Sequence, residues 1–132
     1  MVVSRFAEAA LNGGPVTVYD DGSQVRCFGH VQEMTRCLNA LVQEDSATGR
    51  VFNIGSDQAI SILDLAHVVI EKVDPSVKVE FVAYHDAYGD NFEDVQRRVP
   101  NTDRLYQAIG MRPTMTLDGI LDDIIAWKKQ TL

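Results

Sequence analysis

The sequence predicts an α/β protein with about four helices and several short strands, and three observations support this prediction. Apolar residues recur at helical spacing in long segments that end at Gly, Asp or Pro. Short runs of β-branched and aromatic residues lie between these segments, as strands do in a mixed fold. The chain has 132 residues, 45% of them hydrophobic, so we expect one domain with a modest core and no internal boundary.

Helices and strands are expected in a regular succession. The predicted long helices span 2–12, 31–43, 61–73 and 116–127, and a short helix spans 101–109. The predicted strands span 16–19, 25–28, 50–54 and 78–82. Of these, 50–54 is expected to be a buried strand that ends at a glycine. Residues 83–99 have no clear period and are rich in Tyr, Asp and Gly, which predicts a long functional loop.

Several helix ends carry residues that are typical caps. Ser61 is placed to cap the helix that follows it, and Asp64 suits the positive end of the same helix. Asn101 is expected to cap the short helix, Gly110 to end it in a left-handed conformation, and Thr116 to open the last helix.

Residues 16–28 predict a hairpin-like unit with a candidate binding site. The segment 20–23 has the composition of a turn between two extended arms, with Asp side chains and a glycine that allows positive φ. Tyr19 then lies on one arm, and Gln24 and Arg26 lie on the other. An aromatic ring, an amide and a guanidinium suit a planar base linked to a phosphate. An exposed hairpin with ordinary polar side chains and no binding role would show the same sequence pattern, so this alternative stays open.

Charge and cysteine content exclude several classes of protein. The formal net charge of −7 argues against nucleic acid or an anionic membrane as the main partner. Cys27 and Cys37 are too few for a disulfide framework and have no neighbouring His/Cys cluster for zinc, so we expect buried thiols and no metal. The N-terminus lacks the pattern of a signal peptide, and a cytoplasmic location is expected.

Motifs along the whole chain resemble those of one enzyme family. Residues 11–28 are similar to the nucleotide-binding segment of NAD-dependent nucleotide-sugar epimerases and dehydratases, the extended short-chain dehydrogenases. This family includes UDP-glucuronate decarboxylases and dTDP-glucose 4,6-dehydratases. The resemblance continues at 51–56, 61–66, 98–101, 109–113 and Trp127.

The resemblance implies a substrate site for the diphosphate and base of a UDP-sugar or dTDP-sugar. Val18 and Tyr19 lie where the family holds the base, by backbone contact and by ring packing. Gln24 and Arg26 lie where it reaches the ribose and diphosphate, and Arg98 matches a second diphosphate arginine. Each of these residues also has an ordinary explanation, as a packed strand residue or a surface cation.

The motifs that hold NAD and move protons in this family are absent from these residues. None of the nine glycines forms a Gly-rich dinucleotide turn, and no Tyr is followed four residues later by Lys. Residues 1–132 are therefore expected to be the C-terminal, substrate-binding part of an extended Rossmann-type dehydrogenase, α+β when isolated. The N-terminal Rossmann NAD-binding domain would be missing, NAD would bind only to the full-length parent, and this chain alone would have no catalytic residue and no activity.

Two alternatives from other classes stay open. The chain could be a non-catalytic interaction module that oligomerises through its exposed lobe interface. It could also be a hydrolase that uses His30 with the acidic loop residues Asp86, Asp90, Glu93 and Asp94. Self-association is expected in the fragment interpretation too, through apolar residues of the first helix that include Val2, Val3 and Phe6.

Overall fold

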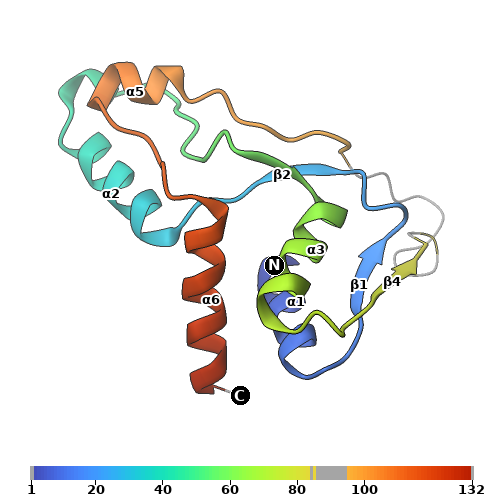
Figure 1. Cartoon of the computed structure of the whole chain (residues 1–132). Helices are drawn as coiled ribbons and strands as arrows, with labels where there is room; N and C mark the ends of the chain where they lie inside the picture. The colour runs from blue at the N-terminus through green and yellow to red at the C-terminus, as the bar shows by residue number, and fades with distance from the viewer. Residues whose placement is uncertain (1, 84, 86–94, 132) are drawn as a thin grey trace. The chain divides into compact units, whose positions relative to one another are not determined.

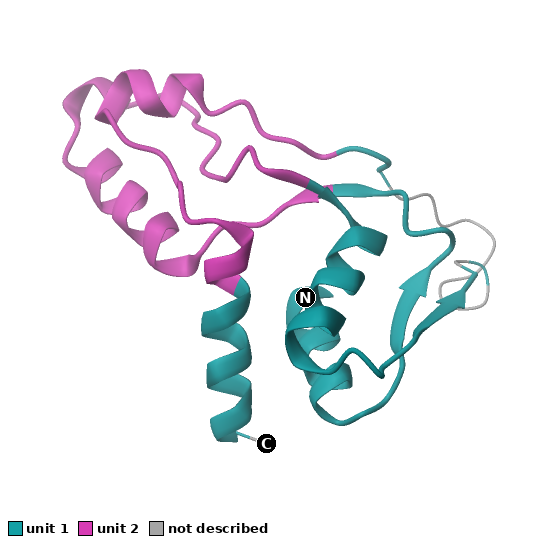
Figure 2. Cartoon of the chain, in the orientation of Figure 1, with its two compact units in different colours: residues 1–25, 60–97, 121–132 teal, residues 26–59, 98–120 magenta. Residues whose placement is uncertain are grey.

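The computed structural model describes residues 2–83, 85 and 95–131 (Figure 1). The chain forms two compact units, and it crosses from one to the other four times (Figure 2). Unit 1 consists of residues 1–25, 60–97 and 121–132, and unit 2 of residues 26–59 and 98–120. The described residues contain five α-helices and four short strands, so the predicted α/β class is confirmed.

Unit 1 is built on a pair of parallel strands. β1 (Val16–Tyr19) pairs in parallel with β4 (Val79–Val82), and the register places Val16 opposite Val79. Helices α1 (Val2–Leu11) and α3 (Ile62–Val73) pack against each other and against β1 (Figure 1). The C-terminal part of α6 (Leu117–Thr131) completes the unit.

The core of unit 1 lies between α1, α3 and β1. Its fully or almost fully buried side chains include Val3, Phe6, Ala7, Ala10, Val16, Val18, Leu65, Ala66, Val69 and Leu121. Ion pairs tie α6 to this core, Lys72 to Asp122 at 2.7 Å and Lys128 to Glu8. The expectation that Val3 and Phe6 are exposed is wrong, because each has an exposed fraction of only 4%.

The predicted hairpin over 16–28 does not form. β1 pairs with β4, whereas β2 (Val25–Cys27) pairs with β3 (Ala59–Ser61) in a separate two-stranded sheet. The turn itself exists, with Gly22 at φ +68°, but its carbonyls face α3. The Gly22 carbonyl accepts from Leu63 N–H at 3.0 Å, and the Gln24 carbonyl accepts from Ile62 N–H at 2.9 Å. The start of α3 thus takes the place that a second hairpin arm would have.

The predicted cap of α3 is confirmed. Ser61 Oγ accepts from Asp64 N–H at 3.0 Å and donates to Asp64 Oδ2 at 2.6 Å. We therefore expect Ser61→Ala to destabilise unit 1 by about 1 kcal/mol, because an orphan N–H of the first turn loses its partner. Urea unfolding followed by the fluorescence of Trp127, the single tryptophan, measures this change. Ser76→Ala, in the turn after α3, is the control, and equal effects of the two substitutions would contradict the capping role.

Unit 2 contains two complete helices, the first turn of α6 and long stretches without regular structure. These helices are α2 (Val31–Val42) and α5 (Asp103–Ile109), which pack against each other, and a short 3-10 turn, η1 (Asp45–Ala47), follows α2. Gly110 ends α5 at φ +67°, as predicted. The helix begins one residue later than expected, and Asn101 Oδ1 accepts from Asp103 N–H at 2.9 Å.

The prediction of a buried strand over 50–54 is wrong. These residues belong to no strand, and the Val51 side chain is 79% exposed. A strand needs a neighbour, and the described part of unit 2 offers no other strand alongside this segment. Side chains supply some of its contacts instead, since Arg104 Nη1 donates to the Val51 carbonyl at 3.0 Å.

The apolar face of the last helix is buried only in part. Ile120, Leu121 and Ile125 of α6 are buried, whereas the Trp127 side chain is 58% exposed. No helix within the described ranges has the length and apolar character needed to cross a membrane.

Candidate functional site

Val18 lies in the middle of β1, and both its side chain and its backbone are engaged within unit 1. Its side chain is fully buried. The N–H groups of Val16 and Asp20 donate at 2.9 and 2.8 Å to the carbonyls of Lys78, directly before β4, and Val82, at the end of β4. Because every second residue of a strand faces the same neighbour, the backbone of Val18 also faces β4. The predicted contact between the Val18 backbone and a base would therefore use the same N–H and C=O groups that face β4 in the sheet.

Tyr19 is oriented differently. It is half-buried, and its backbone alternates with that of Val18, so the amides of Thr17 and Tyr19 face the edge of β1 opposite β4. The Tyr19 carbonyl accepts from Gly22 N–H at 3.2 Å, which closes the turn. Of the two strand residues that the sequence predicts, Tyr19 is the one with accessible surface.

The remaining candidate residues differ in burial and in the unit to which they belong. Gln24 is in unit 1 with an exposed fraction of 2%, and its carbonyl accepts from Ile62 N–H at the start of α3. Arg26, on β2, is half-buried, and Arg98 is exposed. Both arginines belong to unit 2, each directly after a crossing of the chain from unit 1. The structure thus groups the two guanidiniums in one unit and Val18, Tyr19 and Gln24 in the other.

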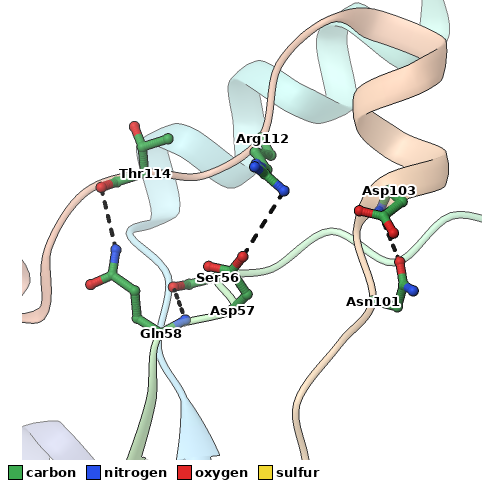
Figure 3. A network of polar contacts seen from close by, with 7 residues as sticks. All are labelled: Ser56, Asp57, Gln58, Asn101, Asp103, Arg112 and Thr114. Atoms are coloured by element: carbon green, nitrogen blue, oxygen red, sulfur yellow. Dashed lines mark hydrogen bonds and ion pairs between the residues drawn. The ribbon is translucent and has the colours of Figure 1, made fainter.

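A polar network in unit 2 was not predicted (Figure 3). Gln58 Nε2 donates to the Thr114 carbonyl at 3.5 Å, and Gln58 N–H donates to Ser56 Oγ at 3.1 Å. Arg112 lies 4.0 Å from the carboxylate of Asp57. The network joins the segment after residue 50 to the segment between α5 and α6.

Glu33 anchors the same region from α2. Its two carboxylate oxygens accept from the N–H groups of Thr114 and Met115, each at 2.9 Å. Partial burial raises the pKa of Glu33, but these hydrogen bonds and the charge of Arg36 lower it more, so the net pKa lies below the usual 4.5. The sequence gives no local signal for this contact, because the partners are far apart in the chain.

An open pocket of about 400 Å³ lies in unit 2. Its lining residues are Val51, Asn53, Asn101, Asp103 and Arg104. Asn53 Nδ2 donates to the Asn101 carbonyl at 3.2 Å. The side chains of Asn53, Asn101 and Arg104 each form a hydrogen bond with a backbone group of unit 2, which indicates a structural arrangement.

The groups required by the hydrolase alternative are not assembled in the described part of the chain. His30 is the N-cap of α2, and its Nδ1 accepts from Gln32 N–H at 3.3 Å. The acidic residues Asp86, Asp90, Glu93 and Asp94 lie outside the described residues. Within the described ranges, no group of three or more His, Cys, Asp or Glu side chains is placed to hold a metal ion.

Neither Cys27 nor Cys37 forms a disulfide bond. Cys27 is half-buried and Cys37 is buried on α2. Burial, together with the charge of Glu33, raises the pKa of the Cys37 thiol. A buried thiol of raised pKa is a poor nucleophile and serves as a small apolar side chain.

The fold is that of Rossmann-type epimerases and dehydratases. The solved UDP-glucuronic acid 4-epimerase of Bacillus cereus, in complex with UDP-glucuronic acid and NAD, matches all of this chain and 40% of its own, with a TM-score of 0.88 at 22% identity. The model of the NAD dependent epimerase/dehydratase family matches residues 1–55. The predicted resemblance to this family is therefore confirmed, and so is the family's association with NAD.

Curated relatives extend the match along the chain. A UDP-N-acetyl-alpha-D-glucosaminuronate decarboxylase of Bacillus cytotoxicus is 30% identical over 129 residues, which are 98% of this chain and 40% of the relative. UDP-glucuronic acid decarboxylase 1 of Arabidopsis thaliana is 32% identical over 116 residues, 88% of this chain and 25% of the relative. The chain thus spans less than half the length of these relatives.

Proposed function

We propose that this chain is the nucleotide-sugar-binding part of an NAD-dependent epimerase, dehydratase or decarboxylase. The supporting observation is that the match to the Bacillus cytotoxicus decarboxylase runs through 98% of this chain but only 40% of the relative. In this proposal residues 1–132 form the C-terminal lobe, and they bind and orient a UDP-sugar or dTDP-sugar.

The two arginines carry the electrostatic part of the proposal. Arg26 and Arg98 would each offer a guanidinium fork to the diphosphate, whose charge needs neutralisation. Tyr19 would pack against the base, while the buried Val18 and Gln24 would support the strand and turn that hold it. Both arginines follow directly on a crossing of the chain, where β2 and residue 98 enter unit 2.

The residues of this chain do not fit NAD itself. The 132 residues contain neither a Gly-rich dinucleotide turn nor a Tyr with Lys four positions later. In the family the cofactor supplies transient oxidation of the sugar, which permits epimerisation, dehydration or decarboxylation. The contribution of this chain is limited to binding and orientation, and we expect no NAD-linked turnover from it alone.

Removal of either arginine is expected to weaken nucleotide binding about tenfold or more. Charge-assisted hydrogen bonds contribute about 1.5–3 kcal/mol each, and 1.4 kcal/mol corresponds to a factor of ten. Isothermal titration of Arg26→Ala and Arg98→Ala with UDP, dTDP and their sugars measures the loss. Arg97→Ala is the matched control, because Arg97 is an exposed neighbour of Arg98 that has no predicted role.

Absence of binding heat from the unaltered chain with every one of these nucleotides would support the interaction-module alternative instead. If the unaltered chain binds a nucleotide and all three variants bind it with the same affinity, Arg26 and Arg98 are ordinary surface cations.

A further inference from the structure

Strand β4 of unit 1 has one paired edge and one outer edge. Along the paired edge, the carbonyls of Lys78 and Val82 accept from β1 and from the residue after it (Figure 1). Backbone groups alternate between the two edges of a strand, so those of Val79 and Phe81 face away from β1. The sheet has two strands within the described residues, and none of the described strands lies beside this outer edge. The sheet therefore leaves the N–H and C=O groups of Val79 and Phe81 without a strand partner.

The two faces of β4 differ in character. Val79 and Phe81 lie on the face of the buried Val18, because the register places Phe81 opposite Val18. The Phe81 ring is nevertheless 56% exposed. Lys78 and Glu80 lie on the opposite face, both exposed, and no ion pair within the described residues engages either of them. The outer edge thus combines an apolar strip on one face with a positive and a negative charge on the other.

The two charges make this edge complementary to a second copy of itself. In an antiparallel pairing centred on Val79, Lys78 of each copy lies opposite Glu80 of the other copy, which is favourable on both sides of the centre. A pairing centred on Glu80 would place two carboxylates opposite each other, and one centred on Phe81 would place Glu80 opposite the apolar Val82. Charge therefore selects one register, although charged residues at a strand edge otherwise discourage pairing.

The same register uses the outer backbone groups and covers the apolar strip. It places Val79 opposite its own counterpart and Phe81 opposite Val77 of the second copy. Because the backbone groups of Val79 and Phe81 face outward, these are the hydrogen-bonded positions of the new ladder. The Val77 N–H already donates to the Asp74 carbonyl at 3.1 Å, so Val77 contributes only its carbonyl, to the Phe81 N–H. Side chains opposite each other have Cβ atoms about 4.5–5.5 Å apart, so the exposed Phe81 ring gains an apolar neighbour.

We infer that the outer edge of β4 is a self-association surface, at which two copies of this chain pair antiparallel about Val79 and join their sheets. The two-fold axis passes through the paired strands, so the assembly closes as a dimer. A strand of four residues buries less than the about 1,200 Å² of a standard interface, so the dimer is expected to be weak and concentration-dependent. The inference does not depend on the proposed function, because it uses none of the residues that bind nucleotide in that proposal.

Charge reversal tests the inference. Sedimentation velocity over a dilution series, without nucleotide, measures self-association of the 132-residue chain. Lys78→Glu and Glu80→Lys should each weaken dimerisation at least tenfold, because each substitution replaces the favourable cross-strand pairs by pairs of like charge. Lys129→Glu reverses an exposed cation on α6 and is the control, which should dimerise like the unaltered chain.

An equimolar mixture of the two reversed variants distinguishes a lost contact from a lost fold. Each variant carries the charges that match the other, so the heterodimer regains the favourable pairs on both sides of Val79. Its dimerisation should return to within about threefold of that of the unaltered chain. At concentrations that populate the dimer, exchange of the Val79 and Phe81 amides with solvent deuterium should slow by about fivefold or more.

Three results would each overturn the inference. The first is a chain that stays monomeric up to about 1 mM. The second is self-association that neither charge reversal weakens, which would place the contact on another surface. The third is a mixture of the two variants that does not restore the dimer.

Discussion

Gly22→Ala is expected to destabilise unit 1 by about 2–5 kcal/mol. Gly22 has φ +68°, a conformation that costs an L-residue about 1–2 kcal/mol. A Cβ at this position would also lie 2.6 Å from Val18 Cγ1 and 2.9 Å from Leu63 Cβ. Both neighbours are held in place, Val18 in the core and Leu63 at the start of α3, so relief of the clash adds about 1–3 kcal/mol.

Gly13→Ala is the matched control for this effect. Gly13 has nearly the same backbone conformation, φ +70°, but a Cβ there would meet nothing within 4 Å. We expect Gly13→Ala to cost only this conformational part, about 1–2 kcal/mol. Urea unfolding followed by Trp127 fluorescence compares the two variants. Equal losses of stability would show that the turn does not pack as closely on α3 as the structure indicates.

Glu33→Ala is expected to cost about 2–3 kcal/mol in the local stability of unit 2. The carboxylate accepts from the N–H groups of Thr114 and Met115, and hydrogen bonds to charged groups contribute about 1.5–3 kcal/mol each, with values at the low end for a partly solvated group. Exchange of these two amides with solvent deuterium should accelerate by about 30-fold or more. An unchanged exchange rate would mean that the segment before α6 is held by other contacts.

The stabilisation by Glu33 should depend on pH in a defined direction. The pKa of Glu33 is lower in the folded chain than its usual 4.5. The stabilisation is therefore fully present above pH 4.5 and is lost as the pH falls through the lowered folded-state pKa. Other carboxylates with lowered pKa, Asp21, Glu44 and Asp74, contribute in the same direction. Glu33→Gln isolates the contribution of Glu33, because the amide does not titrate in this range and can accept only one of the two bonds.

Local signals in the sequence predicted the helices well. Apolar spacing located the four long α-helices of the described residues, and cap and stop residues located the short one. The short-range chemistry of Ser61 and Gly110 gave the correct caps. Strand pairing was less predictable, because a turn composition such as that of 20–23 does not reveal which distant strand each arm will meet. The segment 50–54 has strand-forming residues but forms no strand, because a strand also needs a neighbouring strand, which local sequence does not reveal.

The candidate site shows a similar division. Resemblance picked out Val18, Tyr19, Gln24, Arg26 and Arg98, whose roles stay predictions. It did not indicate that Gln24 would be buried or that Glu33 would hold the segment before α6, because both depend on contacts between distant parts of the chain. Burial and long-range hydrogen bonds are properties of the folded chain, and single residue types do not encode them.

The parallel pairing of β1 with β4 has a consequence for synthesis on the ribosome. Val16 and Val79 are opposite each other, so a loop of about sixty residues must close before the first sheet contact forms. Closing this loop costs chain entropy, and no local contact between the two strands offsets that cost beforehand. Until α3 has left the exit tunnel, the apolar side of α1, which includes Val3 and Phe6, lacks the packing surface that α3 provides. Unit 1 therefore cannot complete its core, and its apolar residues are open to aggregation, before residues 62–82 emerge.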